Sequence, residues 1–225
     1  MGAIEDALIG AQRKAEDLFA DVVSGGLIRP GVFESELSDE IHAIALRRYG
    51  LRRHWHRRIV RSGRNTLLSY YDKPPDRRLA EDDTVYLDFG PVFEEWEADF
   101  GRTYVLGHSP RKHKLVADME TAFRAGKQLY VDTPNLTAGT LYDFVCTLAI
   151  RAGWEFGAPI AGHLVGHFPH EHAPSEPQLL TIRHDSTLRL REPDAKGATR
   201  HWILEIHFVD RANGFGGFME ELLTI

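Results

Sequence analysis

The order of elements that the sequence predicts occurs twice along the chain. Each half is expected to contain two helices followed by acidic strands, with helices at residues 4–23, 33–48, 112–125 and 138–152 and strands at 84–89 and 202–209. Pro30-Gly31 opens the helix before Asp88, and Gly139 opens the helix before Glu205. This repetition predicts an α+β domain with pseudo-twofold duplicated halves and a ligand site at the seam between them.

Shorter β-like runs are expected around these elements. They lie at residues 55–60, 67–71, 97–106, 179–183 and 187–191, with a last strand that ends at residue 225. No low-complexity or Ser/Pro-rich linker divides the 225 residues. We therefore expect residues 1–225 to form a single domain.

Composition excludes several classes of protein. The formal net charge of −6 and the absence of a long basic run argue against nucleic-acid binding. No stretch approaches 18 apolar residues, and Glu5 and Asp6 stand where a secretory signal needs basic residues, so no membrane association and a cytoplasmic location are expected. The single cysteine, Cys146, cannot build a disulfide framework or a Cys-rich zinc site.

Carboxylates occur inside strands that are otherwise apolar. Asp88 alternates with Val85, Leu87 and Phe89, and Asp99 returns 11 residues later on the expected neighbouring strand. Two aspartates that face each other repel unless a cation lies between them, so the pair indicates a cation site. The alternative interpretation is a pair of solvated surface carboxylates.

The same argument applies near the carboxyl end of the sequence. Glu205 lies in the apolar run 202–206, and Glu220-Glu221 lies between apolar pairs. A carboxylate in an apolar strand needs a cation or a proton, unless the strand is an exposed edge.

Histidines gather in one segment. Four of the 12 lie within ten residues that glycines bracket, His163, His167, His170 and His172. Each buried neutral ring needs a hydrogen-bond partner, so this clustering favours a metal site or an acid–base centre. No helical zinc motif fits and Pro169 breaks a helix here, so the segment is expected to be a loop or a strand edge. Together with the carboxylates it could hold two divalent metals ~3.5–4 Å apart.

These residues resemble those of the pita-bread metallopeptidases, which include methionine aminopeptidases, Xaa-Pro aminopeptidases and dipeptidases, and creatinase. The resemblance rests on the following strings in order: Asp88-x10-Asp99, Gly162-His163-x-x-Gly166, His170-Glu171, and then two strand glutamates. It is supported by residues 29–34, 60–66, 99–103 and 214–217 and covers about residues 4–225, which correspond to the catalytic domain alone.

The resemblance implies a curved antiparallel sheet that holds two divalent ions, Mn²⁺, Co²⁺ or Fe²⁺, with Zn²⁺ as a further candidate. Asp88 would hold one metal, Asp99 and Glu220 would bridge both, and His163 and Glu205 would complete the other shell. A metal-bridging hydroxide would attack the scissile carbonyl, with Glu205 as the proton acceptor and His170 as the oxyanion donor.

The chain also departs from the family pattern. Residues 68–71 replace a family histidine after the Gly-x-Asn string, so its proton-handling role is either lost or supplied by His54 or His56. Tyr70 is expected as a further substrate-binding residue. Phe218 or Met219 stands where prolidase-type members carry an arginine. Glu221 is the alternative to Glu220 as the last ligand, and Glu220 fits the family rhythm better.

The function that follows is a dinuclear metal-dependent hydrolase. Short peptides are the expected substrates of this aminopeptidase or dipeptidase, with an Xaa-Pro bond as the leading hypothesis. The alternatives are a creatinase-like hydrolase that cleaves a C–N bond in a small molecule and a non-catalytic binding module with the same fold. Dimers are common in the family, so the resemblance also admits a homodimer.

Overall fold

The computed structural model describes residues 2–169 and 180–224. The first half contains α1 (Ala3–Ser24), α2 (Glu34–Tyr49), β1 (Ile59–Ser62), the 3₁₀ helix η1 (Gly63–Leu67), β2 (Thr84–Phe89), β3 (Val92–Phe93), β4 (Trp96–Glu97) and β5 (Phe100–Val105). The second half contains α3 (Pro110–Asp132), α4 (Ala138–Ala152), β6 (Glu155–Phe156), β7 (Leu164–Val165), β8 (His201–Asp210) and β9 (Phe215–Leu222).

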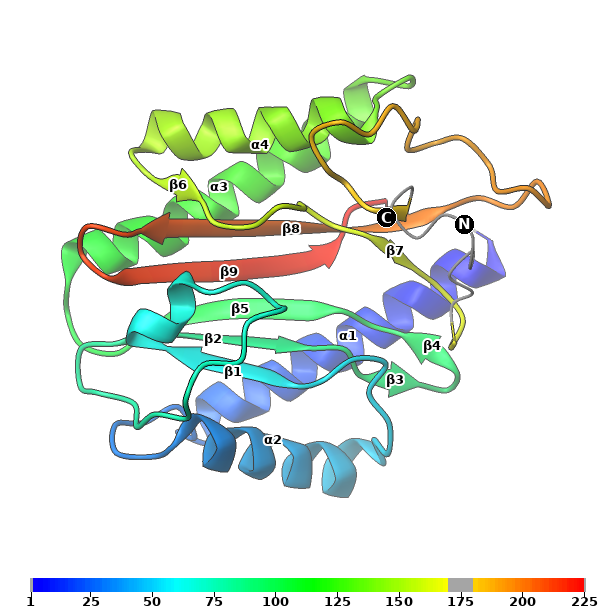
Figure 1. Ribbon diagram of the computed structural model, residues 1–225. Helices are drawn as coiled ribbons and strands as arrows, with labels where there is room; N and C mark the ends of the chain where they lie inside the picture. Colours follow the sequence, from blue (N-terminus) through cyan, green and yellow to red (C-terminus); the bar gives the residue numbers. More distant parts are fainter. Residues whose placement is uncertain (1, 170–179, 225) are drawn as a thin grey trace.

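One antiparallel sheet joins the two halves. Its strand order is β1-β2-β5-β9-β8-β6, and β7 pairs with β8 beside this path. β5 and β9 are therefore neighbours although they lie far apart in the sequence, and Figure 1 shows them side by side near the middle of the molecule. The seam between the expected halves is the contact between these two strands.

Strand alternation separates two apolar cores from a polar face. Val85, Leu87 and Phe89 of β2 pack with α1 and α2 in one core. Leu204, Ile206 and Phe208 of β8 pack with α3 and α4 in the other. Because successive side chains in a strand point to opposite faces, the residues between them turn away from the helices. That face carries Asp88 on β2 and Glu205 on β8.

The helices are amphipathic and cover the sheet. α1 buries Leu8, Leu18 and Phe19 on one side, while Glu5 and Asp6 occupy its first turn. In Figure 1, α1 and α2 lie on the side of β1 and β2, whereas α3 and α4 lie on the side of β8 and β6. Among the described residues, no helix combines the length and the apolar character that a membrane crossing requires.

Parts of the expected secondary structure are wrong. Residues 67–71 form no strand, because the chain enters η1 after β1 and then turns at Ser69–Asp72. β1 is shorter than the expected 55–60 run and displaced from it, and residues 187–191 form no strand, only a bridge between Thr137 and Arg189. Of the expected strand at 179–183, the described part makes a single bridge, between His163 and Thr181.

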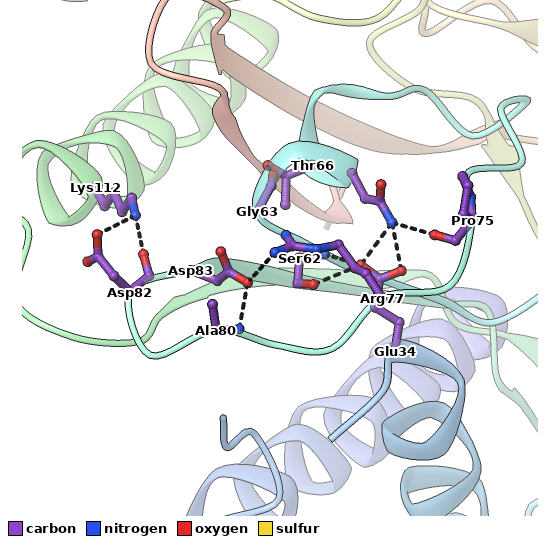
Figure 2. A network of polar contacts seen from close by, with 11 residues as sticks. Glu34, Ser62, Gly63, Thr66, Pro75, Arg77, Ala80, Asp82, Asp83 and Lys112 are labelled. Atoms are coloured by element: carbon purple, nitrogen blue, oxygen red, sulfur yellow. Dashed lines mark hydrogen bonds and ion pairs between the residues drawn. The ribbon is translucent and has the colours of Figure 1, made fainter. Parts of the chain in front are cut away.

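A buried carboxylate explains why the chain turns at η1. The Glu34 side chain, at the start of α2, accepts hydrogen bonds from the Ser62 backbone and hydroxyl at 2.6 and 2.8 Å and from Asn65 Nδ2 at 2.9 Å (Figure 2). On its other side, Thr66 Oγ1 accepts from Gly216 N at 2.7 Å on β9. η1 thus connects α2 of the first half to β9 of the second through hydrogen bonds. In a strand the backbone groups of this segment would instead pair with a neighbouring strand.

Candidate metal centre

A row of aligned residues crosses the sheet on its polar face. Asp88 pairs with Gly101, Gly101 with Glu220, and Glu220 with Glu205 on β2, β5, β9 and β8. Gly101 has no side chain, so Asp88 and Glu220 approach each other over it and form a side-chain hydrogen bond. A Cβ at Gly101 would lie 3.0 Å from Glu220 Oε1. The three acidic side chains of the row therefore converge.

Asp99 and His163 complete this group. Asp99 directly precedes β5, two residues before Gly101 and thus on the same face. His163 Nε2 lies 2.9 Å from Asp99 Oδ2 and 3.6 Å from Glu205 Oε1. The five residues to which the resemblance gave metal-binding roles are together in the structure.

The backbone at Gly162 brings His163 to the sheet. Gly162 has φ +139°, and a Cβ there would lie 2.0 Å from the carbonyl oxygen of Ile203, so only glycine fits. Ile203 N donates to the His163 carbonyl at 2.9 Å. The glycine before the histidine therefore has a structural reason.

The carboxyl groups are buried so deeply that their charged forms are disfavoured. Asp88, Asp99, Glu205 and Glu220 are only 2–8% exposed. Burial raises the pKa of Asp88 to about 6 and that of Glu205 to about 7. Burial, together with Asp99 and Asp88, raises the pKa of Glu220 well above its usual range. Burial therefore favours the protonated form of these three groups, whereas a bound cation would favour the charged form.

Asp99 behaves in the opposite way. Burial would raise its pKa, but the charges of His56 and His163 and their hydrogen bonds lower it to about 2. Burial likewise opposes charge on His56 and His163, yet the adjacent carboxylates raise the pKa of each imidazole to about 9. Asp99 is thus the charged centre of the cluster.

The donor set fits divalent metal ions. Ligand atoms of Asp99, His163 and Glu220 lie within 4.8 Å of one another, as do those of His56, Asp88 and Asp99. Glu220 Oε1 is buried without a hydrogen-bond partner among the described residues. An orphaned buried carboxylate oxygen among other acids is what a cation would satisfy, and oxygen-rich sets with imidazole suit Mn²⁺, Fe²⁺, Co²⁺ and Zn²⁺.

The cluster forms the floor of a cavity of about 440 Å³. The described lining residues are Trp55, His56, Leu68, Ser69, Tyr70, Tyr71, Tyr86, Asp88, Asp99, Ala158, Pro159, Ile160, His163, Thr181, Glu205, His207, Phe218 and Glu220. The cavity is large enough for a short peptide segment.

Only some of the other expected site residues line the cavity. His56 and Tyr70 line the cavity, with their rings 5.8 Å apart. His54 does not line it, because its ring lies against His42 and Phe89. His170 lies outside the described residues.

The two glutamates at the end of β9 face different surroundings. Glu220 lines the cavity, whereas Glu221 pairs opposite Leu204 and contacts the Arg102 guanidinium. This difference follows from strand alternation.

Three rings, which were not among the predicted site residues, form an aromatic wall beside the carboxylates. Tyr86, His207 and Phe218 have ring centroids 5.4–6.3 Å apart, and all three line the cavity. Burial lowers the pKa of His207 to about 4, so the ring is neutral, and its Nε2 donates to the Thr66 carbonyl at 2.9 Å. The signal was available, since His207 and Phe218 each lie two residues from a strand glutamate.

A duplicated α+β fold with a cluster of candidate metal-binding carboxylates on an antiparallel sheet is characteristic of the pita-bread metallopeptidases. The model of metallopeptidase family M24 matches residues 6–195, so the chain belongs to this family. No curated protein is significantly similar to the chain in sequence.

Solved structures of this fold are similar to the chain over nearly its whole length. A prolidase from Thermococcus sibiricus superposes with a TM-score of 0.75 at 20% identity, covering 98% of this chain and 58% of that protein. The TM-score is 0.76 for an X-Pro aminopeptidase from Thermotoga maritima, at 21% identity over 97% of this chain and 60% of that protein. An Xaa-Pro dipeptidase from Bacillus anthracis superposes with a TM-score of 0.76 at 23% identity, covering 100% of this chain and 61% of that protein. The chain therefore spans about 60% of the length of these proteins.

Proposed function

We propose that the chain hydrolyses the peptide bond near the free amino end of short peptides, with two divalent metal ions as cofactors. The observation that carries this proposal is the convergence of Asp88, Asp99, Glu205, Glu220 and His163 in one cavity. Bound divalent ions supply a water of lowered pKa and polarise a carbonyl group. Asp99 and Glu220, at the centre of the cluster, would hold both ions.

Glu205 is suited to move the proton. Its carboxylate lines the cavity 3.6 Å from His163 Nε2, so it is placed to accept a proton from the attacking water and return it to the leaving amine. His170 is the proposed donor to the developing oxyanion.

The charge of the cavity supports binding of an amino end rather than a carboxyl end. Four carboxylates line the cavity, and no lysine or arginine is among the described lining residues. Residues 170–179 contain neither type in the sequence. Arg57, which lies 4.8 Å from the Tyr70 ring, is not a lining residue. Bound divalent ions would offset the charge of the four carboxylates, and no described lysine or arginine is then left in the lining to pair with a free carboxyl end.

The aromatic wall suggests the side chain that the cavity prefers. Tyr86 and Phe218 offer apolar ring surface next to Glu220, and neutral His207 adds no charge. An apolar residue at the amino end of the substrate would bury its side chain there. An Xaa-Pro bond after that residue is the leading hypothesis, because the solved relatives include a protein named as an X-Pro aminopeptidase.

Cleavage of a matched set of peptides tests this function. Protein loaded in turn with Mn²⁺, Co²⁺ and Zn²⁺ would receive Leu-Pro-Ala, Leu-Ala-Ala, acetyl-Leu-Pro-Ala and the dipeptide Leu-Pro. We expect cleavage of a tripeptide with a free amine and a loss of more than about 10²-fold on acetylation, because a site that binds the amine rejects its blocked form. Equal cleavage of the acetylated peptide would contradict amino-end recognition. Cleavage of none by protein with bound metal would favour the creatinase-like or non-catalytic alternative.

A further inference from the structure

We infer that His56 is a second imidazole ligand of the metal centre, on the side of Asp88. This inference rests on the proposed function, since it assumes that the cluster holds metal. The resemblance supplied one imidazole, His163, and gave His56 only a role near substrate.

The first observation is the position of the ring. His56 Nε2 lies 3.0 Å from Asp99 Oδ1 and 3.4 Å from Asp88 Oδ1. His163 Nε2 lies 2.9 Å from the other oxygen, Asp99 Oδ2. The two imidazoles therefore flank one carboxylate, each between Asp99 and a further acid.

The second observation is the tautomer. His56 Nδ1 lies 2.7 Å from the carbonyl oxygen of Arg57, the next residue, and His163 Nδ1 lies 2.7 Å from that of Leu164, again the next residue. A carbonyl only accepts, so Nδ1 donates its hydrogen in both rings and a neutral ring keeps a lone pair on Nε2. In the metal-free protein a proton on Nε2 bridges each ring to the Asp99 oxygens at 3.0 and 2.9 Å, and a metal ion bound to that lone pair would take the place of this proton. Metal-binding histidines are typically oriented in this way, through the ring nitrogen that does not bind the metal.

The third observation is a rigid seat for the ring. A Cβ at Gly90 would lie 2.2 Å from His56 Cδ2, so the ring occupies space that the glycine leaves open. The Trp55 ring contacts both imidazoles, with centroids 4.4 Å from His56 and 5.1 Å from His163. Trp55 is itself held by its Nε1, which donates to the Ala98 carbonyl at 3.0 Å. The His56 ring is thus held in one position, ready to bind a metal ion.

A second imidazole changes the metal preference of the site. With His56 on the Asp88 side and His163 on the Glu205 side, each ion gains one nitrogen donor. Imidazole favours Co²⁺ and Zn²⁺ more than it favours Mn²⁺. The chain should therefore select the former ions more strongly than a site with a single imidazole.

Titration of the metal-free protein with Co²⁺ tests this ligand. The measurements are cobalt bound per chain, the dissociation constant of each ion, and the visible absorption of the bound Co²⁺, none of which requires activity. The variant is His56→Ala and the matched control is His108→Ala, which removes an exposed imidazole outside the cavity. We expect two ions in the wild type and the control. In His56→Ala one ion should bind at least about tenfold more weakly, with a changed spectrum that added imidazole partly restores.

A second variant protects the test against misfolding. His56→Gln keeps a polar side chain at this position but no imidazole, so it should weaken the same ion while the other is retained. Gly90→Ala would place a methyl group 2.2 Å from His56 Cδ2 and 2.4 Å from Trp55 Nε1, so it should disturb the ring as well. If both His56 variants bind two ions with wild-type constants and spectra, His56 is not a ligand and the inference is wrong, although the metal centre stands. If the wild type binds no Co²⁺, the proposed function itself fails.

Discussion

The two halves of the molecule bring equivalent groups to the site but leave them in different electrostatic states. The first half places Asp88, Asp99 and His56 there, and the second places Glu205, Glu220 and His163. Both Asp99 oxygens contact an imidazole, and the pKa of this carboxyl falls to about 2. By contrast, Glu220 keeps one oxygen without a partner among the described residues, and its pKa rises. The aspartate is therefore compensated by protein groups, whereas the glutamate depends on a cation or a proton.

The largest expected effect is shared by both residues. Asp99→Ala and Glu220→Ala should each lower peptide cleavage by more than ~10³-fold, since each removes a group proposed to hold both ions. Cobalt or manganese content per chain would be measured beside the rate. Full activity in either variant would show that the two halves do not share the metals as proposed.

Substitutions in the two halves should have different effects on the free energy of unfolding when the metal-free protein is unfolded with urea. Asp99→Asn should lower the free energy of unfolding by about 3–5 kcal/mol, because it leaves two charged imidazoles without their partner. Glu220→Gln should be neutral or slightly stabilising, because it replaces an uncompensated acid by a neutral group of the same shape. The same sign and size for both variants would contradict the comparison.

Metal addition should stabilise the protein more at high pH. The raised pKa values of Glu205, about 7, and Asp88, about 6, mean that the folded state loses stability as pH rises through that range. His56 and His163, with pKa values of about 9, contribute stability below pH ~6.5 that is lost as pH rises through 9. At a metal concentration of 100 times the dissociation constant, the gain is about 2.7 kcal/mol.

Calorimetry checks this expectation. The metal-dependent rise in Tm should be about 5–10 °C at pH 8. It should be smaller at pH 5.5, where protons already occupy Glu205 and Asp88 and compete with the metal. A rise that does not depend on pH would mean that metal does not replace these protons.

The smallest effect is expected next to the site. Glu221→Gln removes a partner of Arg102 at the partly exposed edge of β9, which should cost about 0–1 kcal/mol and leave metal content unchanged. Loss of metal in this variant, with retention in Glu220→Gln, would reverse the assignment of the last ligand.

The sequence predicted best where a regular element carries the chemistry. Asp88 lies in a strand whose alternation is evident, so the face that it occupies followed from period two. Glu205 was recognised as a carboxylate within an apolar run, which predicted a need for a cation or a proton. The family and the pita-bread fold were also predicted, because the sequence keeps the family's spacing of acidic residues and its Gly162-His163 motif.

The irregular segment 51–58 shows why the rest was not predictable. Treated as part of a strand, His54 and His56 would share a face, yet the chain there makes only an isolated bridge at His54. The two rings separate, His54 toward His42 of α2 and His56 toward Asp99. No periodicity specifies the direction of a side chain in such a segment. The partners that decide it come from other elements, with His42 on α2 for His54 and Asp99, 43 residues away, for His56.

Gly101 gives the site an evolutionary fragility. The hydrogen in place of a side chain at the middle of the acidic row is what allows Asp88 and Glu220 to meet, and a methyl group would contact Glu220 Oε1 at 3.0 Å and the Phe218 ring at 2.9 Å. A glycine codon becomes an alanine codon by one base change. A single mutational step at Gly101 would therefore displace Glu220, the group proposed to hold both metal ions, and under the proposed function it would remove catalysis.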